Sequence, residues 1–264
     1  MTPEVARKII NNNQQIYNEI AHDFSKTRQG KLQELEPLTQ LVKNNDRVLD
    51  VGSGSGRLFE VFGNRDIEFY GIDSGAEMIK ICQEKFKALP RVHFEVADLL
   101  STRFPNNYFN AIYAVATLHH IPSRLLRIKA LQEFHRMLKP GGKLIMTNWY
   151  YWSLPAILII FKFYLSKLLA LILPTKILTW LLSWSFIHLP IRANKKMVAD
   201  LDLGDIFVPW GKVGLRYYHS FRKQELKKLL SRAGFVKITQ YLARKRGDHW
   251  GKRVNLVTIA EKSL

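Results

Sequence analysis

The sequence predicts an α/β fold in which a mostly parallel sheet carries helices on both faces. Three observations support this fold. Short apolar segments alternate with amphipathic ones between residues 45 and 147, a glycine-rich turn follows the first apolar segment, and acidic residues stand at the ends of the first three. Repeated strand–helix units build a parallel sheet. Open sheets of this kind bind ligands at the carboxyl ends of their strands.

Residues 1–44 are expected to form two helices. The first is predicted from apolar residues at roughly helical spacing, namely Ile9, Ile16, Ile20 and Phe24. The second is predicted from Leu35, Leu38, Leu41 and Val42. Both would be amphipathic, so each should pack one face against the core.

The central segment should alternate between strands and helices. Strands are predicted at residues 47–51, 68–72, 92–96, 109–115 and 143–147. Helices are predicted at residues 58–62, 76–88 and 125–138, the last of them stopped by the turn at 139–142.

The carboxyl-terminal segment should complete the sheet. A helix is predicted at residues 223–233, with Ser220 as its N-cap, followed by strands at 235–242 and 255–261. A final hairpin after a helix brings the sheet to seven strands, one of them antiparallel.

The length and composition fit one sizeable domain with an insertion. The chain has 264 residues, of which 47% are apolar, and one cysteine, Cys82. A single cysteine excludes a disulfide framework and any multi-cysteine metal site, and we predict no metal. The polar residues 1–8 show no secretory signal, so we expect a cytoplasmic protein.

The charge of the chain is strongly positive and unevenly distributed. The formal net charge is +18. Residues 192–264 hold 17 Lys and Arg against 6 Asp and Glu. A concentration of positive charge favours a polyanionic partner such as nucleic acid or an anionic membrane surface. The alternative is a solvated basic surface.

The turn after the first strand carries the strongest motif, Gly-x-Gly-x-Gly from Gly52 through Gly54 to Gly56. A dinucleotide fingerprint would place its third glycine one residue later, where Arg57 stands. The spacing suits S-adenosylmethionine (SAM), which has no pyrophosphate, and Asp50 would orient its ammonium group. A nucleotide cofactor or a simple tight turn is the alternative.

Two further acids follow the second and third strands. Asp73 lies 21 residues after Gly52, where a carboxylate holds a ribose diol in related folds. Asp98 is placed to accept a hydrogen bond from an adenine amino group, or else caps the strand end. Together with Asp50, they would meet at the carboxyl edge of the sheet.

These residues resemble class I SAM-dependent methyltransferases. The resemblance extends over residues 45–147 and includes the segments 50–56, 116–120 and 138–142. It implies a Rossmann-like fold and SAM as cofactor. The expected SAM contacts are Tyr17, Arg28, Asp50, Gly52, Ser53, Gly54, Gly56, Asp73, Asp98, Leu99 and Ala114.

A narrower resemblance is to the tRNA wobble-uridine carboxymethyl methyltransferases. It is carried by residues 16–21, Phe24, 27–28, 119–120, 205–210, 216–219 and 225–226. That family methylates the carboxylate of 5-carboxymethyluridine at position 34 of tRNA. The resemblance therefore implies tRNA as substrate and RNA binding. Its eukaryotic members work with a small zinc-binding activator protein, which makes such a partner possible for this chain.

The resemblance suggests roles for several residues. The catalytic candidates are His119, His120, Arg216 and His219, and the substrate-binding candidates are Trp210, Arg216, Tyr217, Tyr218 and His219. Tyr17 would close over SAM, and residues 244–246 and 252–253 would contact the tRNA backbone. Each role has an alternative. The tyrosines would be core and surface residues of one strand, and one of the two histidines would be structural. Arg216 would contact a phosphate or form a surface ion pair, and the basic clusters would belong to a solvated tail.

The segment 150–190 departs from that family because it is strongly apolar, with no acid and three lysines. Its longest uncharged run, residues 177–191, is 15 residues long, and a membrane-spanning helix needs about 20. An interfacial membrane contact, a buried lid and a subunit interface all remain open. A membrane-associated methyltransferase of a lipid, a quinone precursor or another small molecule is therefore the alternative function, and a non-catalytic SAM- or RNA-binding module is the third.

We divide the chain accordingly into four segments. They are a helical cap over the SAM site (1–44), the SAM-binding core (45–149), an apolar helical insertion (150–200) and a substrate-side segment that completes the sheet (201–264).

Overall fold

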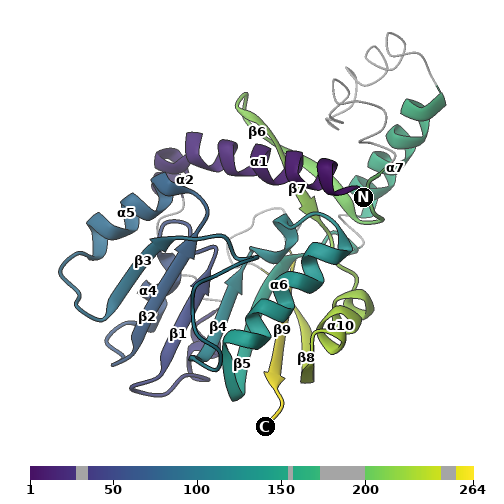
Figure 1. Ribbon diagram of the computed structural model, residues 1–264. Helices are drawn as coiled ribbons and strands as arrows, with labels where there is room; N and C mark the ends of the chain where they lie inside the picture. The colour runs from purple at the N-terminus through teal and green to yellow at the C-terminus, as the bar shows by residue number, and fades with distance from the viewer. Residues whose placement is uncertain (28–34, 154–156, 173–199, 245–253) are drawn as a thin grey trace.

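The computed structural model describes residues 1–27, 35–153, 157–172, 200–244 and 254–264 (Figure 1). Its centre is a seven-stranded sheet in the order β3-β2-β1-β4-β5-β9-β8. The strands are β1 (Arg47–Val51), β2 (Glu68–Asp73), β3 (Val92–Val96), β4 (Phe109–Val115), β5 (Leu138–Trp149), β8 (Phe235–Arg244) and β9 (Val254–Lys262). β1 to β5 pair in parallel, and β9 runs antiparallel to both neighbours. The predicted mixed sheet with one antiparallel strand is confirmed.

Helices cover both faces of this sheet. On one face, α3 (Glu36–Thr39), α4 (Arg57–Phe62) and α5 (Ala76–Phe86) pack over a core that includes Phe62, Phe69 and Cys82. On the other face lie α6 (Arg124–Met137) and α10 (Lys223–Arg232), which bury Phe134 and Leu229. Both layers follow from the strands, whose side chains alternate between the two faces.

A helical cap covers the carboxyl edge of the sheet (Figure 1). α1 (Pro3–Glu19) begins at Thr2, whose hydroxyl accepts the Val5 amide, and α2 (Ala21–Thr27) follows it. The prediction of one helix through Phe24 is wrong, because α1 ends at Glu19 with Ile20 as its C-cap, and α2 begins at Ala21. Among the described residues, the predicted second helix is the single turn α3.

The segment after residue 200 forms a hairpin that the sequence did not reveal. β6 (Asp205–Trp210) and β7 (Gly214–His219) pair antiparallel in a separate two-stranded sheet. The hairpin packs with α1 and with α7 (Ile157–Ile172) around a third apolar cluster, which includes Ile9, Phe163 and Tyr217. It thereby forms one wall above the sheet edge.

Several boundaries differ from the predictions. β5 begins at Leu138, so the predicted turn at 139–142 lies within the strand, where its register with β4 is irregular. Ser220 does not cap α10. Arg222 is the N-cap residue, and its backbone amide donates a hydrogen bond to the Glu225 carboxylate. The Ser220 hydroxyl instead accepts a hydrogen bond from the Tyr151 amide. Among the described residues, no helix is long and apolar enough to cross a membrane.

Candidate functional site

A cavity of about 540 Å³ lies at the carboxyl edge of the sheet, below α1. This volume is in the range of small-molecule and cofactor sites. Its walls come from α1, from the ends of β1, β2 and β3, from the turn after β4, and from β5 and β7. The cavity therefore lies where open α/β sheets bind ligands.

The glycine turn after β1 forms the floor at one end. Gly52, Gly54 and Gly56 all have positive φ, of 70°, 52° and 74°. A Cβ on Gly52 would lie 2.5 Å from the Thr117 side chain, whereas a Cβ on Gly54 would meet only Phe24 at 3.9 Å. Close packing against Thr117 therefore requires glycine at position 52. At position 54 the absence of a side chain leaves the backbone accessible from the cavity.

The predicted carboxylates lie beside this turn. Asp73 accepts hydrogen bonds from the amides of Gly54 (3.0 Å) and Gly75 (2.8 Å). Asp50 is 2% exposed and its Oδ1 has no hydrogen-bond partner. Burial, together with the charge of Asp73, raises the pKa of Asp50 to about 8. Burial also raises the pKa of Asp73, although its backbone hydrogen bonds oppose that shift.

The residues at this end fit SAM. The unpartnered oxygens of Asp50 and of buried Ser53 would accept hydrogen bonds from the ammonium group of the cofactor. Asp73, at the end of β2, would accept hydrogen bonds from the ribose diol of the cofactor. Asp98 and Leu99 line the cavity beyond β3. Asp98 also accepts the Leu100 amide at 2.9 Å, so it caps the strand end as well.

His119 lies at the other end of the cavity and is 1% exposed. Its Nδ1 accepts the Trp149 amide at 3.3 Å, and its Nε2 has no hydrogen-bond partner. Burial, reinforced by the charge of Arg216, holds the pKa of His119 well below its usual range. The ring is therefore neutral, with its N–H on Nε2 as a donor without a protein acceptor.

His120 belongs to a directed chain of hydrogen bonds. Its Nδ1 donates to the Tyr217 carbonyl at 3.0 Å, so in the neutral ring its Nε2 accepts from the Tyr17 hydroxyl, also at 3.0 Å. The Tyr17 oxygen in turn accepts from Arg216 Nη1 at 3.2 Å. Both nitrogens of His120 are thus engaged, and neither histidine is a free base at the cavity.

Arg216 lies directly behind the cavity wall and is 3% exposed. Its guanidinium carbon is 4.6 Å from the ring centre of Trp210, 5.3 Å from that of Tyr218 and 5.7 Å from that of Tyr17. Nε of Arg216 is buried without a hydrogen-bond partner. Of these residues, Tyr17 and Tyr218 line the cavity, whereas Arg216 and Trp210 stand one layer behind them.

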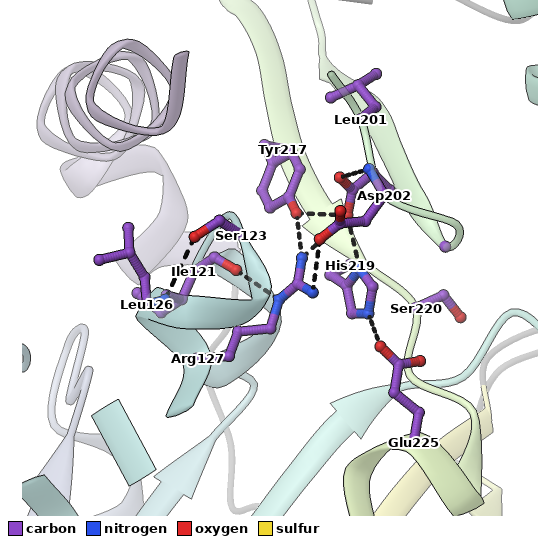
Figure 2. Close-up of polar contacts among 12 residues, drawn as sticks. Ile121, Ser123, Leu126, Arg127, Leu201, Asp202, Tyr217, His219, Ser220 and Glu225 are labelled. Carbon is purple, nitrogen blue, oxygen red and sulfur yellow. Dashed lines mark hydrogen bonds and ion pairs between the residues drawn. The ribbon is translucent and has the colours of Figure 1, made fainter. Parts of the chain in front are cut away.

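Tyr217 and His219 do not line the cavity and instead belong to a buried polar network (Figure 2). The Tyr217 hydroxyl and His219 Nδ1 both donate to Asp205, at 2.5 and 2.6 Å, and His219 Nε2 lies 2.8 Å from Glu225. Arg127 completes the network with bonds to Tyr217 (2.7 Å) and Asp205 (3.1 Å).

This arrangement corrects four predicted contacts. His219 and Tyr217 serve the network and do not reach the substrate side of the cavity. Gly56 lies below the cavity, where a Cβ would meet Phe86 at 2.6 Å. Ala114 is buried within β4. Of the other predicted contacts, Trp210 and Arg216 stand behind the cavity wall, and Arg28 lies outside the described residues.

Three functional residues escaped the sequence reasoning. Ala116, with a φ of 54°, lines the cavity in place of Ala114, and Thr117 beside it bonds the Val51 carbonyl at 2.8 Å. Asn13 clamps β7 by accepting the Tyr217 amide and donating to its carbonyl, at 2.8 and 3.1 Å. An asparagine at a core position of an amphipathic helix was the available signal.

Comparison with known proteins gives a consistent picture. Residues 48–142 match a family model described as a methyltransferase domain. The tRNA (carboxymethyluridine(34)-5-O)-methyltransferase of Mus musculus is 32% identical over 136 residues, which are 51% of this chain and 19% of that protein. The chain thus spans about a fifth of that relative. The phosphoethanolamine N-methyltransferase of Plasmodium falciparum is 26% identical over 211 residues, 78% of this chain and 74% of that protein.

Solved structures share the fold. A SAM-dependent methyltransferase from Methanosarcina mazei superposes with a TM-score of 0.62 at 20% identity, over 86% of this chain and 97% of that one. A putative methyltransferase from Haloferax volcanii, solved in complex with the Trm112 methyltransferase activator, gives 0.59 at 14% identity, over 94% of this chain and 98% of that one.

Proposed function

We propose that this class I SAM-dependent methyltransferase methylates the carboxylate of a carboxymethyl group on the wobble uridine of tRNA, forming a methyl ester. One observation carries the proposal. The acceptor end of the cavity offers a buried hydrogen-bond donor, His119 Nε2, with the cation Arg216 behind it, and its described residues include no free base. This environment suits an acceptor that is already anionic.

The chemistry follows from the acceptor. A carboxyl group has a pKa of about 4 and is ionised at neutral pH, so no base has to remove a proton. Bound SAM supplies an electrophilic methyl group, and the new C–O bond forms while sulfur keeps the electron pair of the broken C–S bond. The protein positions the acceptor and excludes water. His119 would donate to the carboxylate, and Arg216 would hold its charge nearby.

The relatives support the substrate. The mouse protein is named for carboxymethyluridine at position 34 of tRNA. The substrate-side hairpin of this chain contributes Tyr218 to the cavity, and Trp210 and Tyr218 flank Arg216. Aromatic rings of this kind stack on unpaired bases in RNA-binding proteins. We therefore place the uridine on the hairpin side of the cavity.

The test is methyl transfer from labelled SAM to two tRNAs of the same sequence, one carrying carboxymethyluridine at position 34 and the other unmodified uridine. Nucleoside mass spectrometry should find the methyl ester only with the modified tRNA, and mild alkali should remove it. A variant that replaces Asp50 with Asn should lose the product, as a control for SAM dependence. Methylation of both tRNAs alike, or of neither, would refute the substrate.

The Haloferax structure motivates a second arm of this experiment. That methyltransferase is held by an activator, so we propose that a small activator of the Trm112 type could bind this chain. The assay is therefore run with and without such a protein. Methyl ester that forms only in its presence would support the partnership, whereas equal rates would exclude a need for it.

A second candidate function is methylation of a small phosphorylated or lipid-like amine near a membrane. One observation favours it. α7 exposes large apolar side chains, each at least 40% exposed, at Ile157, Leu158, Phe161, Leu165 and Leu168. The Plasmodium relative, which matches most of this chain, is named for phosphoethanolamine. Labelled SAM offered to phosphoethanolamine and to a lipid extract, beside the tRNA, separates the two functions.

A further inference from the structure

We propose that the exposed side of α6 and α10 is a docking surface for the phosphate backbone of RNA. The inference rests on the proposed function, because it assigns to the tRNA a surface outside the cavity. Two helices that are adjacent in space but nearly a hundred residues apart in the sequence build this surface (Figure 1).

The outer side of α10 carries basic side chains and no exposed acid. The helix holds four Lys and Arg residues and one acid. The acid, Glu225, turns inward to His219 at 2.8 Å. The four exposed cations are Lys223, Lys227, Lys228 and Arg232. None of them forms a salt bridge with a residue in the part of the chain that the structure describes.

α6 extends the same surface. It too holds four Lys and Arg residues and one acid. Arg127 is buried in the polar network and Arg136 pairs with Glu133 at 2.7 Å, which leaves Arg124 and Lys129 exposed on the outside. The two helices lie on the same face of the sheet and contact each other. Together they present six exposed cations and no exposed acid.

The opposite face of the sheet shows that this is not simply the basic composition of the chain. On α5, two Lys residues stand against two Glu residues. Lys80 pairs with Glu77 on that helix, and Lys85 pairs with Glu60 on α4. The charges of that face are locally neutralised, whereas the six exposed cations of α6 and α10 form no salt bridge with the described residues. Positive charge is therefore concentrated on one side of the domain.

The location of the surface suits a substrate-guiding role. Ile121 lines the cavity, and Ser123, two residues later, caps α6 through the Leu126 amide at 3.3 Å. The basic surface therefore begins at the cavity rim with Arg124. Phosphate contacts fix the register of a nucleic acid without reading its sequence. RNA held here would present a single unpaired nucleotide to the cavity.

Phosphates of RNA fit this surface better than a bilayer does, because Leu125 on α6, 79% exposed, is the one large apolar side chain that the two described helices expose. The exposed side of α10 consists of lysines, an arginine and the polar residues Gln224 and Ser231. A helix that lies in a membrane interface buries an apolar face in the acyl region. The face of α10 that is apolar, with Leu226 and Leu229, is already buried against the sheet.

The test compares two triple variants with equal charge changes. In the first, Lys223, Lys227 and Lys228 are replaced with Gln. In the second, Lys80, Lys85 and Lys87 on the opposite face are replaced with Gln, and all three are paired with glutamates in the structure. Both lower the net charge by three. Binding of tRNA is measured over a series of salt concentrations, and methyl transfer is measured with tRNA and with free 5-carboxymethyluridine.

The first variant should bind tRNA roughly tenfold more weakly and should lower the slope of log affinity against log salt by about 2 to 3. Its KM for tRNA should rise while kcat and turnover of the free nucleoside stay unchanged. The second variant should match the wild type. Equal behaviour of the two variants would overturn the docking surface, as would loss of binding to anionic phosphatidylserine vesicles with tRNA binding intact.

The binding measurement keeps the two proposals apart. If wild-type protein forms no methyl ester but binds tRNA, and the first variant alone weakens that binding, the substrate proposal fails and the docking surface stands. If methyl ester forms and both variants behave like the wild type, the docking surface fails and the function stands.

Discussion

Tyr17 donates its hydroxyl hydrogen to His120 Nε2 over 3.0 Å, which ties the amino-terminal helix to the turn after β4. The same hydroxyl accepts from Arg216 on β7 and lies 3.3 Å from the Tyr218 hydroxyl. One side chain thus joins the three elements that enclose the acceptor end of the cavity. Its geometry also fixes the tautomer of His120, whose Nδ1 donates to the Tyr217 carbonyl.

Replacing Tyr17 with Phe should lower kcat/KM by roughly 10- to 100-fold. The change removes the hydroxyl that contacts both Arg216 Nη1 and His120 Nε2, and a misplaced acceptor slows a reaction that depends on positioning. SAM affinity should change less than threefold, because the ring remains in the cavity wall. Steady-state kinetics and calorimetry give both values.

The matched control for that variant is Tyr241 with Phe in its place, since Tyr241 is 41% exposed on β8, outside the cavity lining. It should leave both constants unchanged. A Tyr17 variant with wild-type kcat/KM, or one that loses SAM binding in the same proportion as activity, would contradict the positioning role.

SAM affinity should rise with pH up to about 8. Burial raises the pKa of Asp50 to about 8, so at pH 6 its carboxyl group is mostly protonated in the free protein. A cationic ligand favours the ionised form, so binding releases a proton below pH 8, and affinity gains up to about tenfold per pH unit from 6 to 8. A carboxylate with an ordinary pKa is fully ionised above pH 5, so it would leave SAM affinity unchanged between pH 6 and 8.

Calorimetry in two buffers of different ionisation enthalpy measures this proton release directly. Replacing Asp50 with Asn should weaken SAM binding and abolish the release between pH 6 and 8. Proton release that persists in the Asn variant would assign the titration to another group and contradict the role of Asp50.

The parts of this site that could be predicted are those built from residues close together in the sequence. The β1 turn, Asp73 and Asp98 follow from local periodicity and spacing, and they all line the cavity, apart from Gly56. The pairing of β6 with β7 joins segments whose register no local pattern specifies. For that reason the hairpin was not predicted, although residues 205–210 and 216–219, which form its strands, were already noted for the family resemblance.

Alternation along β7 explains the incorrect site residues. Neighbouring side chains on a strand point to opposite faces, so Arg216 and Tyr218 share one face and Tyr217 and His219 share the other. The sequence indicated all four as substrate contacts. Only the packing of α6, with Arg127 reaching Tyr217, decides which pair faces the cavity.

Gly52 should tolerate no side chain. Replacing it with Ala puts a Cβ 2.5 Å from Thr117 and forces a residue with a side chain to a φ of 70°. Strain and overpacking together should lower the free energy of unfolding by about 2 to 5 kcal/mol and abolish SAM binding.

The control for the glycine variant is Gly211 with Ala in its place, between β6 and β7. Its φ is also positive, at 50°, but a Cβ there would meet nothing within 4 Å. It should lower the free energy of unfolding by about 1 to 2 kcal/mol and keep SAM binding. Urea unfolding and calorimetry distinguish the two positions, and equal losses would show that the contact with Thr117 has no part in the effect.

The network around Arg127 should contribute mainly to stability and to the position of the hairpin. Replacing Arg127 with Met leaves Asp205 buried with fewer cations and should lower the free energy of unfolding by about 3 to 5 kcal/mol. Replacing Tyr217 with Phe removes one buried hydroxyl and should lower it by about 1 to 2 kcal/mol. Arg124, exposed on the same helix, is the control: its change to Met should alter stability by less than about 0.5 kcal/mol.

Acid titration tests the same network with a definite sign. Burial by itself would raise the pKa of Asp205, but the hydrogen bond and charge of His219 and the charge of Arg127 outweigh it and lower that pKa. A lowered carboxyl pKa adds stability that is complete above about pH 4 and is lost as the pH falls through the folded-state value. With Met at position 127 the pKa of Asp205 is lowered less. Urea unfolding between pH 5 and 3 should therefore show a smaller acid-dependent loss in the free energy of unfolding than in the wild type. An equal or steeper loss would mean that Arg127 does not hold the Asp205 charge, and that β7 keeps its orientation for another reason.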